Sequence, residues 1–374
     1  MSWQQERSAQ LFDTIDTPSV LIELAVMERN LQRMQTRAQV LKKSLRPHSK
    51  THKIPELARR QVELGAEGVM VAKLDEAEAM LRGGITSQSV GYPLIGTIKA
   101  RRLMDLISRG LTPRVSVDSV PAVDLLDRVG VDAGCVVDAM IEVDTGLHRC
   151  GLRNIDDIVA LAQYLAQRSF VRFSGITCFG GHIGYRPSVA ETVSLIDEED
   201  ALLDSVAAVL SRHGLDPGII SEGGTVIAHF AERLKRATEL RPGIYIFNDV
   251  STVCSHAATW EDCAAHVLTT VVTRPDPTWA VIDAGSKTLS LDPSPSGGYG
   301  YVSGREDLRV TRLTEEHGII EQVDGRPFHL HLGERLLIVP NHICTTINLH
   351  DRVALVESGR VLRWMAVEGR GGIH

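Results

Sequence analysis

The chain has 374 residues, a formal net charge of −7 at pH 7, a hydrophobic content of 43% and a mean hydropathy of −0.01. This length is too great for one ordinary core, so we expect a large domain of about 250 residues and a smaller one. The negative charge argues against nucleic acid as a partner, and no apolar run approaches the ~20 residues that a membrane span needs. The N-terminus has no signal-peptide core, and the six cysteines form no CxxC pair. We therefore expect a cytoplasmic protein that acts on no membrane.

The first predicted elements are a short apolar strand within residues 16–24 and a helix over about residues 25–41. Strand-like runs then alternate with helical patterns, such as those over 55–62 and 191–210. Eight strands that alternate with helices predict a (β/α)8 TIM-type barrel of the α/β class, although an open doubly wound sheet would show the same alternation. The eight runs are Ser44–Lys50, Gly68–Ala72, Ser87–Tyr92, Pro113–Ser119, Val136–Asp144, Arg172–Phe179, Ile219–Gly223 and Leu240–Phe247.

The pattern changes beyond about residue 262, where β-branched runs are separated by Gly, Pro and charged turns and no long helical period appears. The clearest runs are Val267–Val272, Trp279–Asp283, Leu336–Val339, and a hairpin that pairs Val353–Val356 with Val361–Met365. These features predict a C-terminal, mostly antiparallel β domain. The expected parts are residues 1–24 as an N-terminal strand that joins the β domain, residues 25–261 as the barrel and residues 262–374 as the β domain.

A compact basic stretch, RPHSKTHK, occupies residues 46–53 at the end of the first barrel strand. Pro47 lacks a backbone donor, so we expect the strand to turn into a loop there. A lysine at such a strand end can enter a pocket where desolvation and neighbouring cations lower its pKa, which Schiff-base chemistry requires. The stretch by itself also fits a solvated basic loop or an anion-binding patch.

Polar side chains also follow the fifth and sixth predicted strands. The fifth ends in EVDTGLHRCG, which places a carboxylate, His148 and Arg149 in one loop. The sixth ends in CFGGHIGY, whose glycines permit close approach to a ligand and whose His182 and Tyr185 can stack or donate hydrogen bonds. Because chemistry in barrels collects where strands end, both loops are candidates for a site. Each of them alone also fits a structural turn.

The seventh strand ends in SEGGT, directly before a helical segment. Glycines at such a turn expose backbone N–H groups at a positive helix end, and the Thr225 hydroxyl adds a donor, so Gly224 and Thr225 form a candidate anion cradle. Tyr245, in the eighth strand-like run, could add another phosphate contact. A lysine and a phosphate cradle on neighbouring strands of one barrel mouth suggest pyridoxal phosphate.

A further cluster is VPNHICTTINLHD at residues 339–351. In an extended strand, residues two apart point to one face, so His342 and Cys344 could bind one ion from the same side. Imidazole with thiolate favours zinc over magnesium or calcium. A His-x-Cys pair can also be ordinary packing.

The ordered motifs RPHSKTHK, EVDTGLHRCG, GGHIGY, EGGT, RPGIYIFND, VIDAGSK and VPNHICTTINLHD resemble those of the D-threonine aldolase and D-serine dehydratase family. These are fold-type III pyridoxal phosphate enzymes related to alanine racemase, and the similarity runs from Asp16 to about Asp351. The resemblance implies a cofactor-binding barrel, a C-terminal β domain and a homodimer that acts on D-amino acids.

The same resemblance implies a role for each matched position. Lys50 would be the catalytic Schiff-base residue, His182 would lie near the substrate, and Arg149 would approach the ring hydroxyl of the cofactor. Tyr185, Gly224, Thr225 and Tyr245 would make further contacts with the cofactor. His342 and Cys344 would bind a divalent metal.

Two reactions are open to such a site. An aldolase would cleave a D-threonine-like substrate to glycine and an aldehyde, whereas a dehydratase would release a 2-oxo acid and ammonia. Cys344 resembles the zinc-dependent dehydratases, while aldolases of the family with a carboxylate there use manganese or magnesium. The contexts GGHIGY and VPNHICTTINLHD resemble bacterial aldolases, and we therefore expect an aldolase. A racemase would need Tyr299 or Tyr301 as its acid–base group, and residues 262–374 distinguish the chain from single-domain, non-catalytic cofactor-binding barrels.

Overall fold

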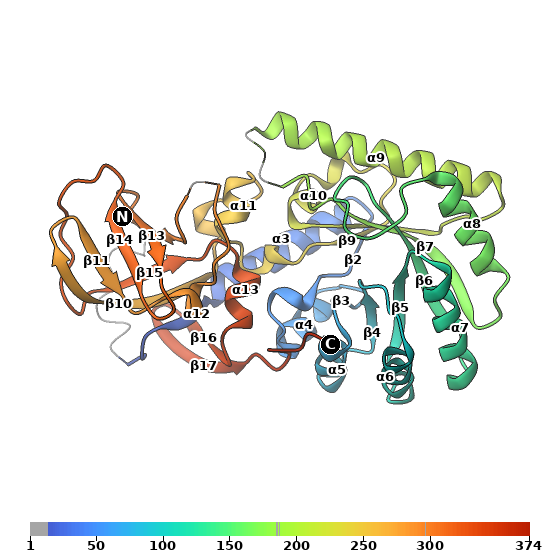
Figure 1. Cartoon of the computed structure of the whole chain (residues 1–374), viewed down its shortest axis with the longest axis horizontal. Coiled ribbons are helices and arrows are strands. Elements are labelled where there is room, and N and C mark those ends of the chain that lie inside the picture. The colour runs from blue at the N-terminus through green and yellow to red at the C-terminus, as the bar shows by residue number, and fades with distance from the viewer. Residues whose placement is uncertain (1–13, 185, 187, 296) are drawn as a thin grey trace. The chain divides into compact units, whose positions relative to one another are not determined.

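The computed structural model describes residues 14–184, 186, 188–295 and 297–374. The chain forms two compact units (Figure 1). One contains the described residues up to Leu31 together with Ile244–Gly371, and the other contains Gln32–Gly243 with Gly372–His374. Each unit has its own β-sheet.

The second unit is built on eight parallel strands in the order β2-β9-β8-β7-β6-β5-β4-β3. The two edges of this sheet meet, because Met70 N donates to Pro47 O at 2.8 Å and Glu67 N donates to Leu45 O at 2.9 Å. This contact confirms the predicted barrel and distinguishes it from an open sheet. The strands are β2 Ser44–Leu45, β3 Val69–Val71, β4 Ser87–Val90, β5 Thr112–Val117, β6 Val137–Val143, β7 Val171–Phe179, β8 Ile219–Gly223 and β9 Glu239–Arg241.

Helices connect these strands, and Figure 1 shows α6, α7 and α8 along the outer side of β5–β7. Their apolar faces form one core with the outward side chains of the strands. Among the described helices, none is both long and apolar enough to cross a membrane. The helices are α4 Pro55–Glu63, α5 Leu74–Arg82, α6 Thr97–Ser108, α7 Val120–Ala133, α8 Ile155–Ala166, α9 Val189–Arg212 and α10 Thr225–His229.

The first and last barrel strands are shorter than the sequence predicted. β2 ends at Leu45, and residues Ser49–Thr51 instead wind into the 3-10 helix η1. β9 ends at Arg241, directly before Pro242, and the chain then forms the 3-10 helix η3 at Ile244–Ile246. A proline near each strand end removes a backbone donor, which limits the ladder there.

The barrel interior is polar around Glu239. One Glu239 oxygen, Oε2, accepts hydrogen bonds from Arg46 Nε and Arg114 Nη1, both at 2.9 Å, and Oε1 accepts from Ser221 Oγ at 2.6 Å. The β5 strand of Arg114 is separated from β9 by three strands, so this contact crosses the interior. Burial raises the pKa of Glu239, but the two guanidinium groups outweigh burial and lower it overall.

The first unit is built on a nine-stranded, mostly antiparallel sheet in the order β11-β14-β13-β12-β15-β10-β1-β16-β17. Within it, β1 pairs antiparallel with β10 and parallel with β16. The strands are β1 Ser19–Glu23, β10 Ala265–Asp276, β11 Trp279–Ile282, β12 Tyr301–Val302, β13 Leu308–Leu313, β14 Gly318–Gln322, β15 Arg335–Val339, β16 Arg352–Glu357 and β17 Arg360–Ala366. The remaining α-helices are α3 Leu24–Val40, α11 Val250–Cys254, α12 Ser286–Leu289 and α13 Ile343–Asn348.

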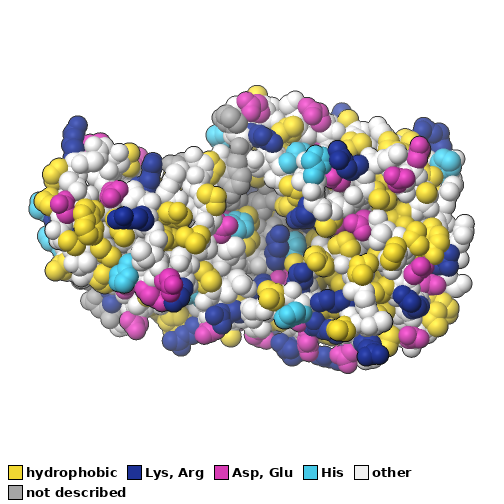
Figure 2. All heavy atoms as spheres, viewed as in Figure 1, with side chains coloured by type: hydrophobic (Ala, Val, Ile, Leu, Met, Phe, Trp, Pro, Cys, Tyr) yellow, Lys and Arg dark blue, Asp and Glu magenta, His cyan; other side chains and the backbone are white. Residues whose placement is uncertain are grey.

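Charged side chains are scattered over the face of the molecule shown in Figure 2. On the face shown in Figure 2, lysine and arginine side chains are interspersed with aspartate and glutamate. The net charge of −7 is therefore not gathered into one patch on this face.

Candidate functional site

Lys50 lies in η1, directly beyond the short strand β2, and its side chain is half-buried. Its Nζ atom lies 5.5 Å from the centroid of the Phe179 ring, at the end of β7. β7 is separated from β2 by β9 and β8, so the amine reaches across the mouth of the barrel. Lys50 is therefore directed into the mouth rather than along the outer wall.

Phe179 is the residue around which this mouth is arranged, and the sequence analysis did not single it out. The guanidinium carbon of Arg149 lies 4.9 Å from the same ring centroid. A Cβ atom on Gly224 would lie 3.8 Å from Phe179, and one on Gly181 would lie 2.6 Å from it. The signal that could have identified Phe179 is its position as the last residue of a barrel strand.

The cradle residues lie at the ends of the neighbouring strands. Gly224 has φ +122° and is the N-cap of α10, while Thr225 is its first residue and is buried. A Cβ atom on Gly243 would lie only 2.8 Å from Thr51 Oγ1, so the segment after β9 passes directly over η1. His48 N donates to Pro242 O at 2.9 Å across the same junction. Lys50 and the Gly224–Thr225 turn thus belong to one continuous mouth.

Arg241, a buried cation on β9, was also overlooked as a site residue. Its Nη1 lies 2.9 Å from Met70 Sδ, and its Nη2 donates to Ser221 O at 3.2 Å and to Cys178 O. Burial, then Lys50, Arg241 and Arg149, hold the pKa of His48 well below its usual range. Three cations acting on one imidazole indicate a positive mouth that suits an anion.

The loop after β6 holds its polar groups in a defined arrangement. Asp144 Oδ1 accepts from Gly146 N at 3.0 Å and from His148 N at 2.9 Å, and Oδ2 lies 3.0 Å from His148 Nδ1. Partial burial raises the pKa of Asp144, but the hydrogen bonds outweigh it and lower the pKa to about 2. Arg149 Nη2 lies 3.8 Å from Oε1 of Glu142, which is the next-to-last residue of β6. The structure therefore brings the carboxylate, His148 and Arg149 together, as the sequence predicts.

His182 lies in the next loop and faces the first one. A Cβ atom on Gly146 would be 3.0 Å from His182 Nε2, so the two loops are in contact. Burial and the nearby Arg186 lower the pKa of His182, which keeps its imidazole neutral at pH 7. Its Nδ1 atom is buried and has no hydrogen-bond partner among the described residues. Tyr185 lies outside the described residues.

Three predicted site residues belong to the first unit. Tyr245 lies in η3 and is buried. His342 and Cys344 do not lie in a strand, so the predicted metal-binding strand is wrong in its geometry. His342 is the N-cap of α13, with extended backbone angles, and Cys344 lies in the first turn of that helix.

The buried carboxylate of Asp249 stabilises the start of α13. Asp249 Oδ2 accepts the Ile343 N–H at 2.9 Å, which satisfies a donor at the start of α13. The same oxygen lies 3.4 Å from His342 Nδ1. Cys344, with a smaller contribution from Asp249, raises the pKa of His342 to about 12 despite the opposing effect of burial. The thiol and imidazole therefore interact, with Asp249 behind the imidazole, in the manner of a metal ligand and its supporting carboxylate.

Comparison with known proteins finds relatives that match nearly the whole chain. The family model described as "Alanine racemase, N-terminal domain" matches residues 22–250, and that described as "Putative serine dehydratase domain" matches residues 264–356. The chain is 32% identical over 362 residues to the D-threonine aldolase of Arthrobacter sp., covering 96% of this chain and 93% of that protein.

Two further relatives cover a similar share. The chain is 32% identical over 376 residues to the D-threo-3-hydroxyaspartate dehydratase of Delftia sp., covering 95% of this chain and 98% of that one. The crystal structure of the D-threonine aldolase from Filomicrobium marinum superposes with a TM-score of 0.89 at 30% identity and covers 96% of this chain and 97% of that one. Relatives at equal identity thus carry an aldolase name and a dehydratase name.

Proposed function

The chain belongs to the alanine racemase-like fold-type III family of pyridoxal phosphate enzymes, and from that premise we propose that it cleaves D-threonine-like 3-hydroxy amino acids to glycine and an aldehyde. Membership makes it a pyridoxal phosphate-dependent lyase. The observation that carries the proposal is the half-buried Lys50, directed into a mouth that also contains Arg149 and the Gly224 turn.

The residues of the mouth fit the cofactor. An anionic aldehyde needs an amine that can form a Schiff base and a positive surface for its phosphate. Lys50 supplies the amine, and the Gly224–Thr225 turn at the start of α10 would receive the phosphate. Burial lowers the pKa of His48, and Lys50, Arg241 and Arg149 lower it further, which agrees with the three cations lying near the mouth. When bound, pyridoxal phosphate supplies an electron sink for the bond that breaks.

We assign the surrounding residues as follows. Lys50 would form the covalent link, Gly224, Thr225 and Tyr245 would bind the phosphate, and Tyr185 would make a further cofactor contact. Arg149 would orient the ring through its hydroxyl oxygen. Its guanidinium beside Phe179 is only half-buried, so a ligand in the mouth can reach it.

His182 is suited to move the proton of the substrate hydroxyl. Its imidazole is neutral because burial and Arg186 lower its pKa, and a neutral imidazole can accept a proton at pH 7. Its position against Gly146 fixes the ring between two loops of the mouth. This arrangement makes His182 the candidate base for a retro-aldol cleavage.

His342 and Cys344 would hold the divalent metal. Thiolate and imidazole favour zinc, and manganese or magnesium are the alternatives that an aldolase suggests. Asp249, 3.4 Å from His342 Nδ1, is placed to orient the imidazole. The metal would supply Lewis-acid polarisation of the substrate hydroxyl.

Dehydration is the second candidate, and Cys344 favours it. Thiolate ligation suits zinc, and the Delftia relative is named a dehydratase at the same 32% identity as the Arthrobacter aldolase. In that reaction Lys50 would remove the α-proton, and the hydroxyl would leave as water.

Product analysis separates the two reactions. The purified protein, supplied with pyridoxal phosphate and either zinc or manganese, is incubated with D-threonine, and with L-threonine as the control. Glycine with acetaldehyde supports the aldolase, whereas 2-oxobutanoate with ammonia identifies the dehydratase. Formation of L-allo-threonine, by inversion at Cα, would identify a racemase or epimerase and contradict both lyase reactions.

A further inference from the structure

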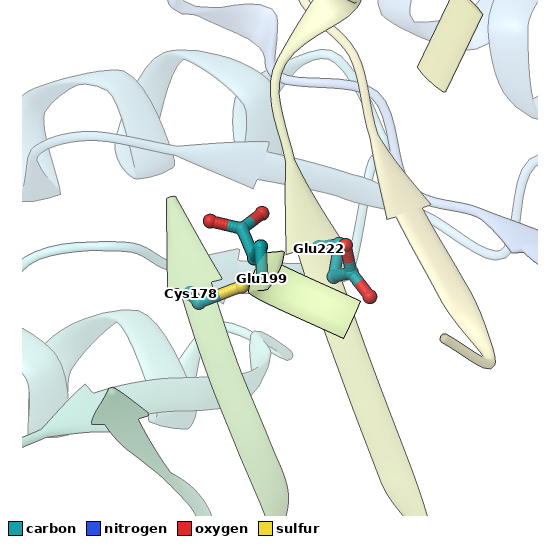
Figure 3. A group of neighbouring side chains, drawn as sticks. All are labelled: Cys178, Glu199 and Glu222. Atoms are coloured by element: carbon teal, nitrogen blue, oxygen red, sulfur yellow. The ribbon is translucent and has the colours of Figure 1, made fainter. Parts of the chain in front are cut away.

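A second group of potential metal ligands lies in the barrel unit and is distinct from His342 and Cys344. It consists of Cys178 on β7, Glu222 on the adjacent β8 and Glu199 on α9 (Figure 3). One ligand atom from each residue lies within 4.8 Å of the others. The exposed fractions of the three are only 1%, 1% and 3%. We call this group the Cys178 cluster.

The Cys178 cluster lies on the outer side of the barrel wall, beneath α9. Ser221 points into the barrel, where it donates to Glu239, so its neighbour Glu222 points outward. Cys178 belongs to the core that packs strands against helices, together with Leu203 and Val206 of α9. The cluster is therefore separated from Lys50 and Phe179 by the strands themselves.

The carboxylates of this cluster lack the partners that burial demands. Neither oxygen of Glu222 has a hydrogen-bond partner among the described residues, nor does Oε1 of Glu199. Glu199 Oε2 accepts from the Thr145 hydroxyl. Lys43 acts electrostatically on Glu222, but its Nζ donates to Leu234 O and Ala237 O, both at 2.6 Å. An unpaired buried carboxylate is strongly unfavourable, so the site requires a cation or bound protons.

The charge balance shows the same need. Burial, reinforced by Glu199 and Asp200, raises the pKa of Glu222 to about 8. Burial raises the pKa of Glu199 to about 7, against the opposing effect of the Thr145 hydrogen bond. Burial likewise raises the pKa of the Cys178 thiol well above its usual range. A divalent cation would offset the burial, and at Glu222 the added repulsion, that raise the pKa of these groups.

We propose that Cys178, Glu199 and Glu222 bind a structural zinc ion that ties α9 to β7 and β8. A thiolate with carboxylate oxygens is a donor set that zinc accepts and that magnesium and calcium do not favour. The second oxygen of Glu222 has no partner among the described residues and can complete a four-coordinate set. The three ligands come from three elements, so the ion would cross-link the helix to the sheet. This site is independent of the reaction assigned above.

The test starts from the double variant His342→Ala/Cys344→Ala, which removes the other candidate metal ligands. After equilibration with zinc and desalting, elemental analysis should find one zinc per chain. Adding Glu222→Gln should lower that content about tenfold or more, whereas the exposed neighbour change Glu198→Gln should leave it unchanged. With cobalt in place of zinc, the parent should show a thiolate charge-transfer band that Cys178→Ser abolishes.

Thermal melting gives a second readout that does not depend on activity. If zinc is bound, a chelator should lower the melting temperature of the double variant and leave the Glu222→Gln form unaffected. The proposal would be overturned if the double variant bound no zinc and its melting temperature did not respond to added zinc. In that case Glu222→Gln should raise the melting temperature. That result would mean that shared protons, and no metal, neutralise the cluster.

Discussion

Glu239 holds the polar barrel interior together, and replacing it with glutamine should destabilise the barrel unit strongly. The side chains of Glu239 and Arg46 are only 2% and 5% exposed, and that of Arg114 is 15% exposed. The substitution keeps an acceptor for Ser221 but leaves two guanidinium groups without their buried counter-charge. Breaking a buried ion pair in this way costs about 3–5 kcal/mol of unfolding free energy. Arg46 keeps its hydrogen bond to Ser87 Oγ at 3.1 Å, but its remaining carboxylate partner among the described residues is the exposed Glu67, at 4.0 Å.

Urea unfolding followed by far-UV circular dichroism measures this loss, because the long helices of the barrel dominate that signal. The tryptophans of the described residues, Trp260, Trp279 and Trp364, all belong to the other unit, so their fluorescence follows that unit separately. Asp138→Asn is the matched control. It removes an exposed ion pair with Arg172 at 2.7 Å, which should contribute no more than about 1 kcal/mol. If Glu239→Gln cost no more than this control, the interior network would not stabilise the barrel.

Three other outcomes can be checked. Lys50→Ala should abolish the visible absorbance band of the lysine-bound cofactor, while the exposed Lys42→Ala keeps it; an unchanged spectrum would remove Lys50 from its proposed role. Asp249→Asn should weaken metal affinity about 10–100-fold, because Asp249 lies 3.4 Å from His342 Nδ1 and orients its imidazole. A competition titration with a chromogenic chelator measures this affinity, and an unchanged value would mean that the carboxylate plays no part. Burial lowers the pKa of His52 from 6.5 to about 4, so its contribution to stability is full above pH 6.5 and is lost as the pH falls toward 4. The wild-type protein should therefore lose about 2 kcal/mol of unfolding free energy from this group between pH 7 and pH 5, and His52→Gln should show a correspondingly flatter pH dependence of urea unfolding.

The barrel could be predicted because each strand carries a local signal. Ile219–Gly223, for example, is a short β-branched run that ends in glycine, and the structure has β8 at the same residues. Strand ends also predict where polar groups gather, and His148 and Arg149 meet Asp144 and Glu142 in the loop after β6. Local periodicity was sufficient in both cases.

Contacts between distant residues could not be predicted in this way. The α13 helix begins at Ile343 because its N–H bonds to Asp249, 94 positions earlier in the chain, and nothing in the local run indicates that partner. In the sequence, Glu199 is one of many charged residues of a predicted helix. Only the folded structure shows that it lies beside Cys178 and Glu222. Such groups become visible only when the register of the strands is known.

The position of β1 constrains the order in which the chain can fold during synthesis. Its residue Ser19 pairs with Leu268, and Leu21 pairs with Ala354, so the first strand emerges from the ribosome long before either neighbour exists. All eight barrel strands, β2 to β9, are translated within that interval, and their contacts can form as they appear. The nine-stranded sheet, in contrast, can be completed around β1, which lies between β10 and β16, only when translation is almost finished.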